Sequence, residues 1–159
     1  MNAQSNSAPS FPSDRTAPPP SRDALGSPEQ ELLDRAVIRS EEASHRESLE
    51  RAKEGALLGA ELRETFKNQK TLGREALKKL ERLEKLARGI RSRAGGSDDD
   101  DILENPPRDL ETALARLAEL SAELRKHVEK TSRHVVSTAV IEQSNELIEL
   151  VRIIRTFTP

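Results

Sequence analysis

A seven-residue pattern of small and apolar side chains in a long proline-free stretch most constrains the fold of this chain. No proline occurs between Glu29 and Asn105. Side chains spaced alternately four and three residues apart fall on one face of an α-helix, and such a repeat predicts a helix that supercoils with other helices. We call this face the seam. It comprises Ala52, Gly55, Gly59, Leu62, Phe66, Gln69, Gly73, Ala76, Leu80, Leu83, Ala87 and Ile90.

Composition indicates the same class of fold. Of the 159 residues, 34% are hydrophobic and 34% are charged, and the chain has three Phe but no Trp or Tyr. Because large aromatic side chains dominate burial in thick cores, this composition favours long helices that bury a stripe. We therefore expect an all-α protein, a long antiparallel helical hairpin or coiled coil with a disordered N-terminal tail.

The N-terminal part divides into a tail and a first helix. Residues 1–26 are rich in Ser, Pro and Ala without a hydrophobic period, which predicts disorder. Ser27, Pro28 and Gln30 have the spacing of a helix-capping box, so a helix is predicted over residues 27–93. Glycine weakens a helix interior, so we expect that a bend or break could occur near one of four glycines. These are Gly55, Gly59, Gly73 and Gly89.

A linker is predicted over residues 94–107. Gly95 and Gly96 are expected to stop the first helix. The four like charges of Asp98 to Asp101 repel one another and favour solvent.

The second helix is predicted over residues 108–157. Asn105 is expected to cap it, with Pro106 and Pro107 in its first turn. Two long helices joined by a short linker form an antiparallel hairpin by default, because each must bury its apolar stripe.

Several functional classes are disfavoured. The chain has no cysteine, which excludes disulfides and thiolate metal sites. His127 and His134 lie seven residues apart, but no further zinc ligands are obvious, so surface or seam histidines are expected. No paired-carboxylate, serine–histidine or phosphate-loop pattern is visible. We expect no enzyme activity, no cofactor, no metal and no nucleic-acid binding, in a cytoplasmic protein without a transmembrane segment.

Positive charge is concentrated in residues 67–93, which carry ten bases and three acids. This stretch could lie peripherally on acidic lipid or on the acidic face of a partner. The alternative is a solvated helix face, and the sequence favours that alternative.

The seam carries a more specific pattern. Gly59 precedes Gln69 by ten residues, and residues 52–59 read Ala-Lys-Glu-Gly-Ala-Leu-Leu-Gly. This pattern resembles the SNARE family, specifically its Qb type, whose heptad motifs contain a central glutamine layer and a stretch of the form Ala-x-Glu-x-x-x-Ile-Gly. The resemblance covers about residues 42–93.

The resemblance implies a soluble SNARE-like module that joins, or competes for, a four-helix membrane-fusion bundle of SNARE helices. The chain departs from the family at Gly73, which occupies a layer usually filled by Leu, and by the lack of an anchor after the motif. The alternative is a structural coiled-coil subunit or adaptor of a larger helical complex with no fusion role. Gln69 separates the two interpretations, because only a SNARE-like bundle requires its amide to meet other polar side chains.

Overall fold

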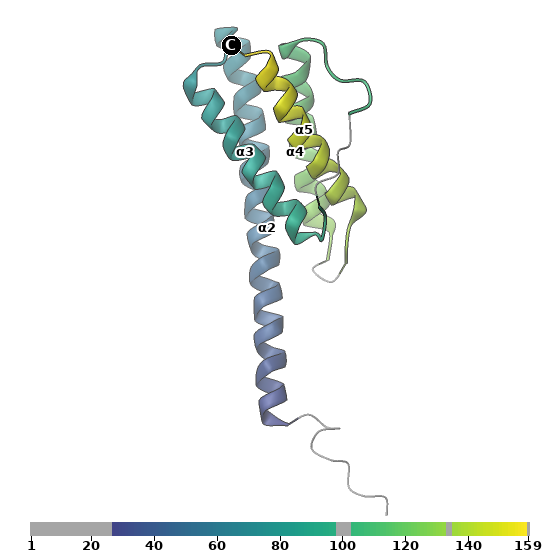
Figure 1. Cartoon of the computed structure of the whole chain (residues 1–159). Helices are drawn as coiled ribbons and strands as arrows, with labels where there is room; N and C mark the ends of the chain where they lie inside the picture. Colours follow the sequence, from purple (N-terminus) through teal and green to yellow (C-terminus); the bar gives the residue numbers. More distant parts are fainter. Residues whose placement is uncertain (1–26, 98–102, 133–134, 159) are drawn as a thin grey trace, which may run out of the picture. The chain divides into compact units, whose positions relative to one another are not determined.

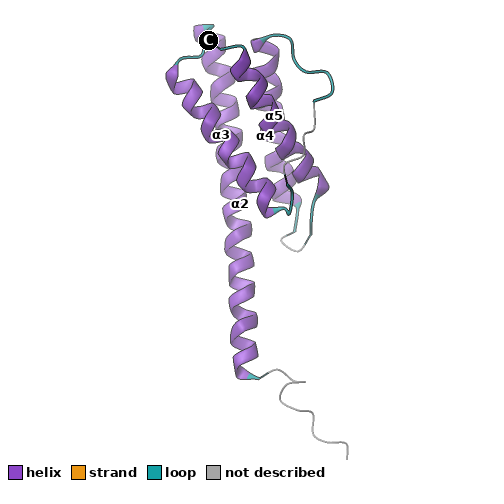
Figure 2. Ribbon diagram, in the orientation of Figure 1, coloured by secondary structure: helices purple, strands orange, loops and turns teal. Residues whose placement is uncertain are grey.

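The computed structural model describes residues 27–97, 103–132 and 135–158, and over these residues the chain forms α-helices and no strand (Figure 2). The all-α prediction is therefore confirmed. The helices are α2 (Pro28–Gln69), α3 (Arg74–Arg93), α4 (Leu110–Lys130) and α5 (Thr138–Thr156). The predicted tail, residues 1–26, and the acidic run Asp98–Asp101 lie outside the described residues. Residues 1–40 and 41–159 form two units, each of which is described by itself.

The start of α2 agrees with the sequence prediction. The side-chain oxygen of Ser27 accepts a hydrogen bond from the backbone N–H of Gln30 at 3.1 Å. Pro28 occupies the first helical position, where its missing N–H leaves no hydrogen bond unmade. Only the serine half of the capping box forms, because the Gln30 amide donates to Asp34 at 3.1 Å instead of turning back.

The prediction of one helix over residues 27–93 is wrong, because α2 and α3 are separated by a turn. Lys70 adopts the left-handed conformation with φ 60, and its N–H donates to the carbonyl of Phe66 at 2.8 Å. This geometry closes a helix. Gly73 then precedes α3 in an extended conformation. The break lies at one of the four glycines where a bend was expected, and it lets two helical arms pack together, which one straight helix cannot do.

The end of α3 confirms the predicted glycine stop. Gly95 has φ 86, a left-handed conformation in which side chains other than glycine are strained. Its N–H donates to the carbonyl of Ser92, and the N–H of Gly96 donates to the carbonyl of Arg91 at 2.9 Å. These two bonds form a Schellman motif, which satisfies the last carbonyls of the helix.

The predicted cap of the second helix is wrong, because α4 is capped by Asp109 rather than Asn105. The carboxylate of Asp109 accepts hydrogen bonds from the backbone N–H of Thr112 at 2.8 Å and from its hydroxyl at 2.9 Å. Asn105 precedes a proline, which disfavours the helical conformation, and it has φ 54. Its carbonyl accepts a hydrogen bond from Arg116, so it holds the linker against α4.

The second predicted helix, residues 108–157, is also divided in two. α4 ends at Lys130 and α5 begins at Thr138. The intervening segment is rich in β-branched and hydroxyl side chains, which favour caps and extended backbone over helix. The hydroxyl of Thr131 donates to the carbonyl of His127 at 2.6 Å, and the hydroxyl of Ser137 accepts from the N–H of Val140 at 3.3 Å.

Within residues 41–159 the helices form an antiparallel four-helix bundle (Figure 1). α2 lies beside α3 through contacts such as Glu54 with Arg82, and beside α4 where Gly59 approaches Ser121. α5 contacts both α3 and α4. The order around the bundle is therefore α2, α3, α5, α4, and Figure 1 shows that each helix runs opposite to its neighbours. The prediction was one hairpin of two long helices. The structure instead has two hairpins, one formed by α2 and α3 and the other by α4 and α5.

Aliphatic side chains from all four helices fill the core. The largest side chains that are almost completely buried are Leu62, Leu80, Leu83, Leu114, Leu117, Leu124, Leu147, Leu150, Val151 and Ile154. The linker contributes Leu103, which is 5% exposed. Large aromatic side chains are absent from this list, so the bundle packs as thin layers of leucine, as the composition predicts.

Candidate interaction surfaces

Most seam residues lie inside the bundle. On α2, Ala52, Gly55, Gly59 and Leu62 are buried, and Phe66 is half-buried against the core. On α3 the buried seam residues are Ala76, Leu80, Leu83, Ala87 and Ile90. The two arms face one another across the turn, so the seam of this chain is covered by its own helices.

Two seam residues lie apart from the core. Gln69 is the last residue of α2 and is exposed, and Gly73 is exposed beside α3 with open space around the position of a Cβ atom. Within this bundle Gln69 therefore does not form a buried polar layer. Its meeting with polar side chains of a partner stays a prediction.

The small residues of α2 permit a close approach of helices. A Cβ atom added at Gly59 would lie 2.3 Å from the hydroxyl oxygen of Ser121 and 3.3 Å from the Cα of Ala118, both on α4. A Cβ atom at Gly55 would meet only the end of the Leu83 side chain, at 3.3 Å. Gly59 thus allows α2 and α4 to pack closely at this position, because there is no room for a Cβ atom.

Ion pairs hold α2 and α3 together at the edge of the core. The guanidinium of Arg82 donates two hydrogen bonds to the carboxylate of Glu54, at 2.8 and 3.0 Å. These hydrogen bonds, followed by the positive charge of Arg82, lower the pKa of Glu54 against the opposing effect of burial. Lys79 also forms an ion pair with Glu61, at 3.0 Å. Several bases in the positively charged range 67–93 are therefore neutralised by acids of this chain.

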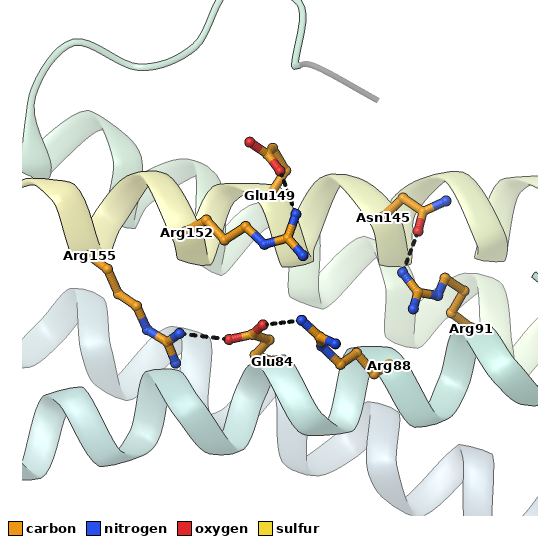
Figure 3. Close-up of polar contacts among 7 residues, drawn as sticks. All are labelled: Glu84, Arg88, Arg91, Asn145, Glu149, Arg152 and Arg155. Atoms are coloured by element: carbon orange, nitrogen blue, oxygen red, sulfur yellow. Dashed lines mark hydrogen bonds and ion pairs between the residues drawn. The ribbon is translucent and has the colours of Figure 1, made fainter. Parts of the chain in front are cut away.

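A polar cluster connects α3 and α5 (Figure 3). Glu84, only 8% exposed, lies between Arg88 at 2.6 Å and Arg155 at 3.0 Å. Further along the same interface, the guanidinium of Arg91 donates to the side-chain oxygen of Asn145 at 2.9 Å. Buried polar groups need such partners, so these contacts fix how α3 and α5 align.

An exposed apolar face lies in the other unit, on the first part of α2. Residues 28–40 are exposed throughout, including four large aliphatic side chains within seven positions. Leu32, Leu33, Val37 and Ile38 are 64%, 61%, 56% and 45% exposed. Leu33 and Val37 lie one helical turn apart and share a face, and Leu32 and Ile38 each lie about 100° further round the helix, one on either side. We call these four residues the α2 apolar face.

The α2 apolar face was not predicted from the sequence, because the predicted seam begins at Ala52. The available signal was the set of aliphatic residues at 32, 33, 37 and 38, of which positions 33 and 37 lie one helical turn apart. Such a set predicts an amphipathic helix but does not show whether the chain itself covers the apolar side.

Comparison with protein-family models, with curated protein sequences and with solved structures finds no match. Among the described residues, no helix combines the length and apolar character needed to cross a membrane. His127 lies 2.7 Å from the side-chain oxygen of Gln143, whereas His134 is outside the described range. Over residues 27–97, 103–132 and 135–158, the structure contains no cluster of three His, Asp or Glu side chains placed to hold a metal ion.

Proposed function

We propose that this chain is a non-enzymatic protein-interaction module, a structural subunit or adaptor that docks a helix of a partner on the α2 apolar face. The observation that carries the proposal is the exposure of Leu32, Leu33, Val37 and Ile38, each between 45% and 64%. Contiguous exposed aliphatic side chains are unfavourable in water and usually mark an interaction site.

The chemistry of the face favours a helical partner. Leu33 and Val37 repeat after one helical turn, which is the spacing at which helices interdigitate. Fully burying one such aliphatic side chain contributes about 1.5–3 kcal/mol, so an amphipathic helix that covers several of them supplies a useful affinity. Charged residues alternate with the apolar ones, among them Glu31, Asp34 and Arg35, and they favour a partner with polar edges.

The proposal that the protein is not an enzyme is supported by the surroundings of its buried carboxylate. Glu84 is the one carboxylate among the described residues that is buried, and two arginines neutralise it. A general acid or base needs a position from which it can reach a substrate. Glu84 instead serves as a structural link between α3 and α5.

A SNARE-like role stays a prediction and is the second interpretation. Its motif spans the turn between α2 and α3, so pairing with SNARE helices requires Lys70 to become helical and both arms to leave the core. Opening would expose leucines such as Leu62 and Leu80, which are 0% exposed in the bundle. A four-helix partner complex would have to bury the same side chains again. The α2 apolar face requires no such opening, and for this reason we favour the adaptor.

Contact of residues 67–93 with acidic lipid is a further prediction. Arg82, Lys79 and Arg88 pair with acids of the chain. Contact would therefore depend on cations such as Arg74, which lies at the exposed start of α3. Sedimentation with vesicles that contain phosphatidylserine tests this prediction, and binding that survives Arg74→Gln and a rise in salt would contradict it.

Site-specific photocrosslinking tests the adaptor proposal. A photoreactive phenylalanine analogue is placed at Leu33 of the full chain, in cells that express the protein naturally, and a matched variant carries it at Leu57. Leu57 is similarly exposed, at 59%, but lies on the bundle. We expect discrete crosslinks from position 33 that disappear with Val37→Asp, and few from position 57. The same crosslinks from both positions, or crosslinks that persist with Val37→Asp, would contradict the proposal.

A further inference from the structure

A cavity lies at the end of the bundle where α3 and α4 end and α5 begins. Its volume is about 110 Å³, and all of its lining residues belong to residues 41–159. α3 ends at Arg93, α4 ends at Lys130 and α5 starts at Thr138, so the helices no longer fill the space between them. α2 passes beside the cavity with His45 and Ser48.

The inner wall of the cavity is apolar. It is formed by Ile90, Val128 and Val140, which are 2%, 4% and 4% exposed. A dry apolar cavity of about 150 Å³ is enough to hold benzene. The space here is smaller, so it suits a group of only a few carbon atoms.

The rim of the cavity carries an arginine, a histidine and an acidic residue. Arg93 is exposed and His45 is half-buried, and both line the opening. Glu41 also lines it, but this carboxylate already interacts within the chain. A guanidinium binds a carboxylate through two parallel hydrogen bonds, so Arg93 is suited to an anionic head group.

We propose that this cavity binds a short-chain carboxylate. The alkyl group lies against Ile90, Val128 and Val140, and the carboxylate faces Arg93 and His45. Between-helix spaces with an apolar wall and a few convergent polar groups are common ligand sites. This site is independent of the α2 apolar face, so either proposal can fail without the other.

Titration of the full chain with butanoate tests the proposal, monitored by NMR of labelled isoleucine and valine methyl groups. We expect butanoate to shift the methyl signals of Ile90, Val128 and Val140 with a Kd on the order of 1 mM, because the ligand has few atoms. Acetate keeps the head group without the chain, and butylamine keeps the chain with the opposite charge. Both should bind more weakly than butanoate.

Arg93→Gln should weaken butanoate binding about threefold to tenfold, through loss of a charge-assisted hydrogen bond. Arg108→Gln is the matched control, because Arg108 is an exposed arginine outside the lining of the cavity. Both changes affect exposed side chains, so the circular dichroism spectra should stay unchanged. Equal affinity for butylamine, no loss in Arg93→Gln, or unchanged methyl signals at concentrations well above the millimolar range would overturn the proposal.

Discussion

Replacing Gly59 with alanine adds a methyl group where α2 packs closely on α4. At an ordinary helical position this substitution stabilises by about 1 kcal/mol, because alanine has the higher helix propensity. At Gly59 the new carbon would fall 2.3 Å from the Ser121 hydroxyl oxygen and 3.3 Å from the Cα of Ala118. The first contact is impossible without movement, and the second involves backbone.

The smallest adjustment is a rotation of the Ser121 side chain. Ser121 is 2% exposed, and its hydroxyl donates to the carbonyl of Ala118 at 3.1 Å. Rotation breaks this bond in a place that water does not reach, and loss of such a bond costs about 0.5–1.5 kcal/mol. Separation of the two helices costs more, about 1–3 kcal/mol for an overpacked core. Set against the gain in propensity, the expected net loss of stability is about 0–2 kcal/mol.

Urea denaturation followed by circular dichroism measures the effect, with Gly55→Ala as the matched control. The carbon added at Gly55 meets only the flexible end of Leu83, at 3.3 Å. Gly55→Ala should therefore keep most of the stabilisation that comes from the higher helix propensity of alanine. The Gly55→Ala variant should be more stable than the Gly59→Ala variant by about 1–3 kcal/mol. Gly59→Ala should also be less harmful in a Ser121→Ala background. If Gly59→Ala stabilises as much as Gly55→Ala and shows no coupling to Ser121, the close packing of α2 on α4 is refuted.

Three further predictions follow from individual contacts. The pKa of Glu54 is lowered by Arg82, so its contribution to stability is present above the ordinary value of 4.5 and is lost as pH falls through the lowered pKa. Glu54→Gln should reduce the free energy of unfolding by less than about 1 kcal/mol at neutral pH, because the Glu54–Arg82 pair is exposed. If the variant stays less stable than the parent protein at low pH as well, the ion pair is not the cause. Ser137→Ala should lower stability by about 0.5–1 kcal/mol in thermal or urea denaturation through loss of the α5 cap, whereas Ser137→Asp should not; equal losses would argue against capping. Gln69→Leu should change stability by less than about 0.5 kcal/mol because Gln69 is exposed, and a large stabilisation would indicate that it lies in a core.

The sequence predicted the helical class and several helix ends. Ser27 and Gly95 have strong local signals, a cap and a left-handed stop, and both act where they were expected. Most seam residues are buried in the bundle, and their role in binding a partner stays a prediction. Periodicity reports which side chains face a core, and it does so whether that core belongs to the same chain or to another.

Local sequence did not single out the turn after Gln69, because Gly73 was only one of four glycines near which a break was expected. No proline marks it, and the left-handed residue is Lys70 rather than a glycine. The seam spacing continues through Gly73 into α3, because both arms face the same core. A heptad repeat therefore cannot distinguish one straight helix from two arms of a bundle. Tertiary packing decides between them, since folding back buries both arms.

The break between α4 and α5 had a signal that was overlooked. Thr131, Ser132, Val135, Val136 and Ser137 are poor helix formers, and as a group they outweigh the absence of glycine and proline. The cavity could not be predicted at all, because its walls come from three separate stretches, within residues 41–48, 90–94 and 128–140, that meet only in the folded bundle.

The central claim is that residues 41–93 fold back on themselves within one chain. Spin labels at Lys53 and Glu81, two partly exposed positions beside the Glu54–Arg82 pair, measure this directly by double electron–electron resonance. Packed helices lie about 8–10 Å apart, so the labels should be separated by less than about 25 Å. A continuous helix would place the two residues about 42 Å apart at 1.5 Å per residue. A short distance that persists after dilution with unlabelled protein supports the bundle, and a long distance, or a short one that dilution removes, contradicts it.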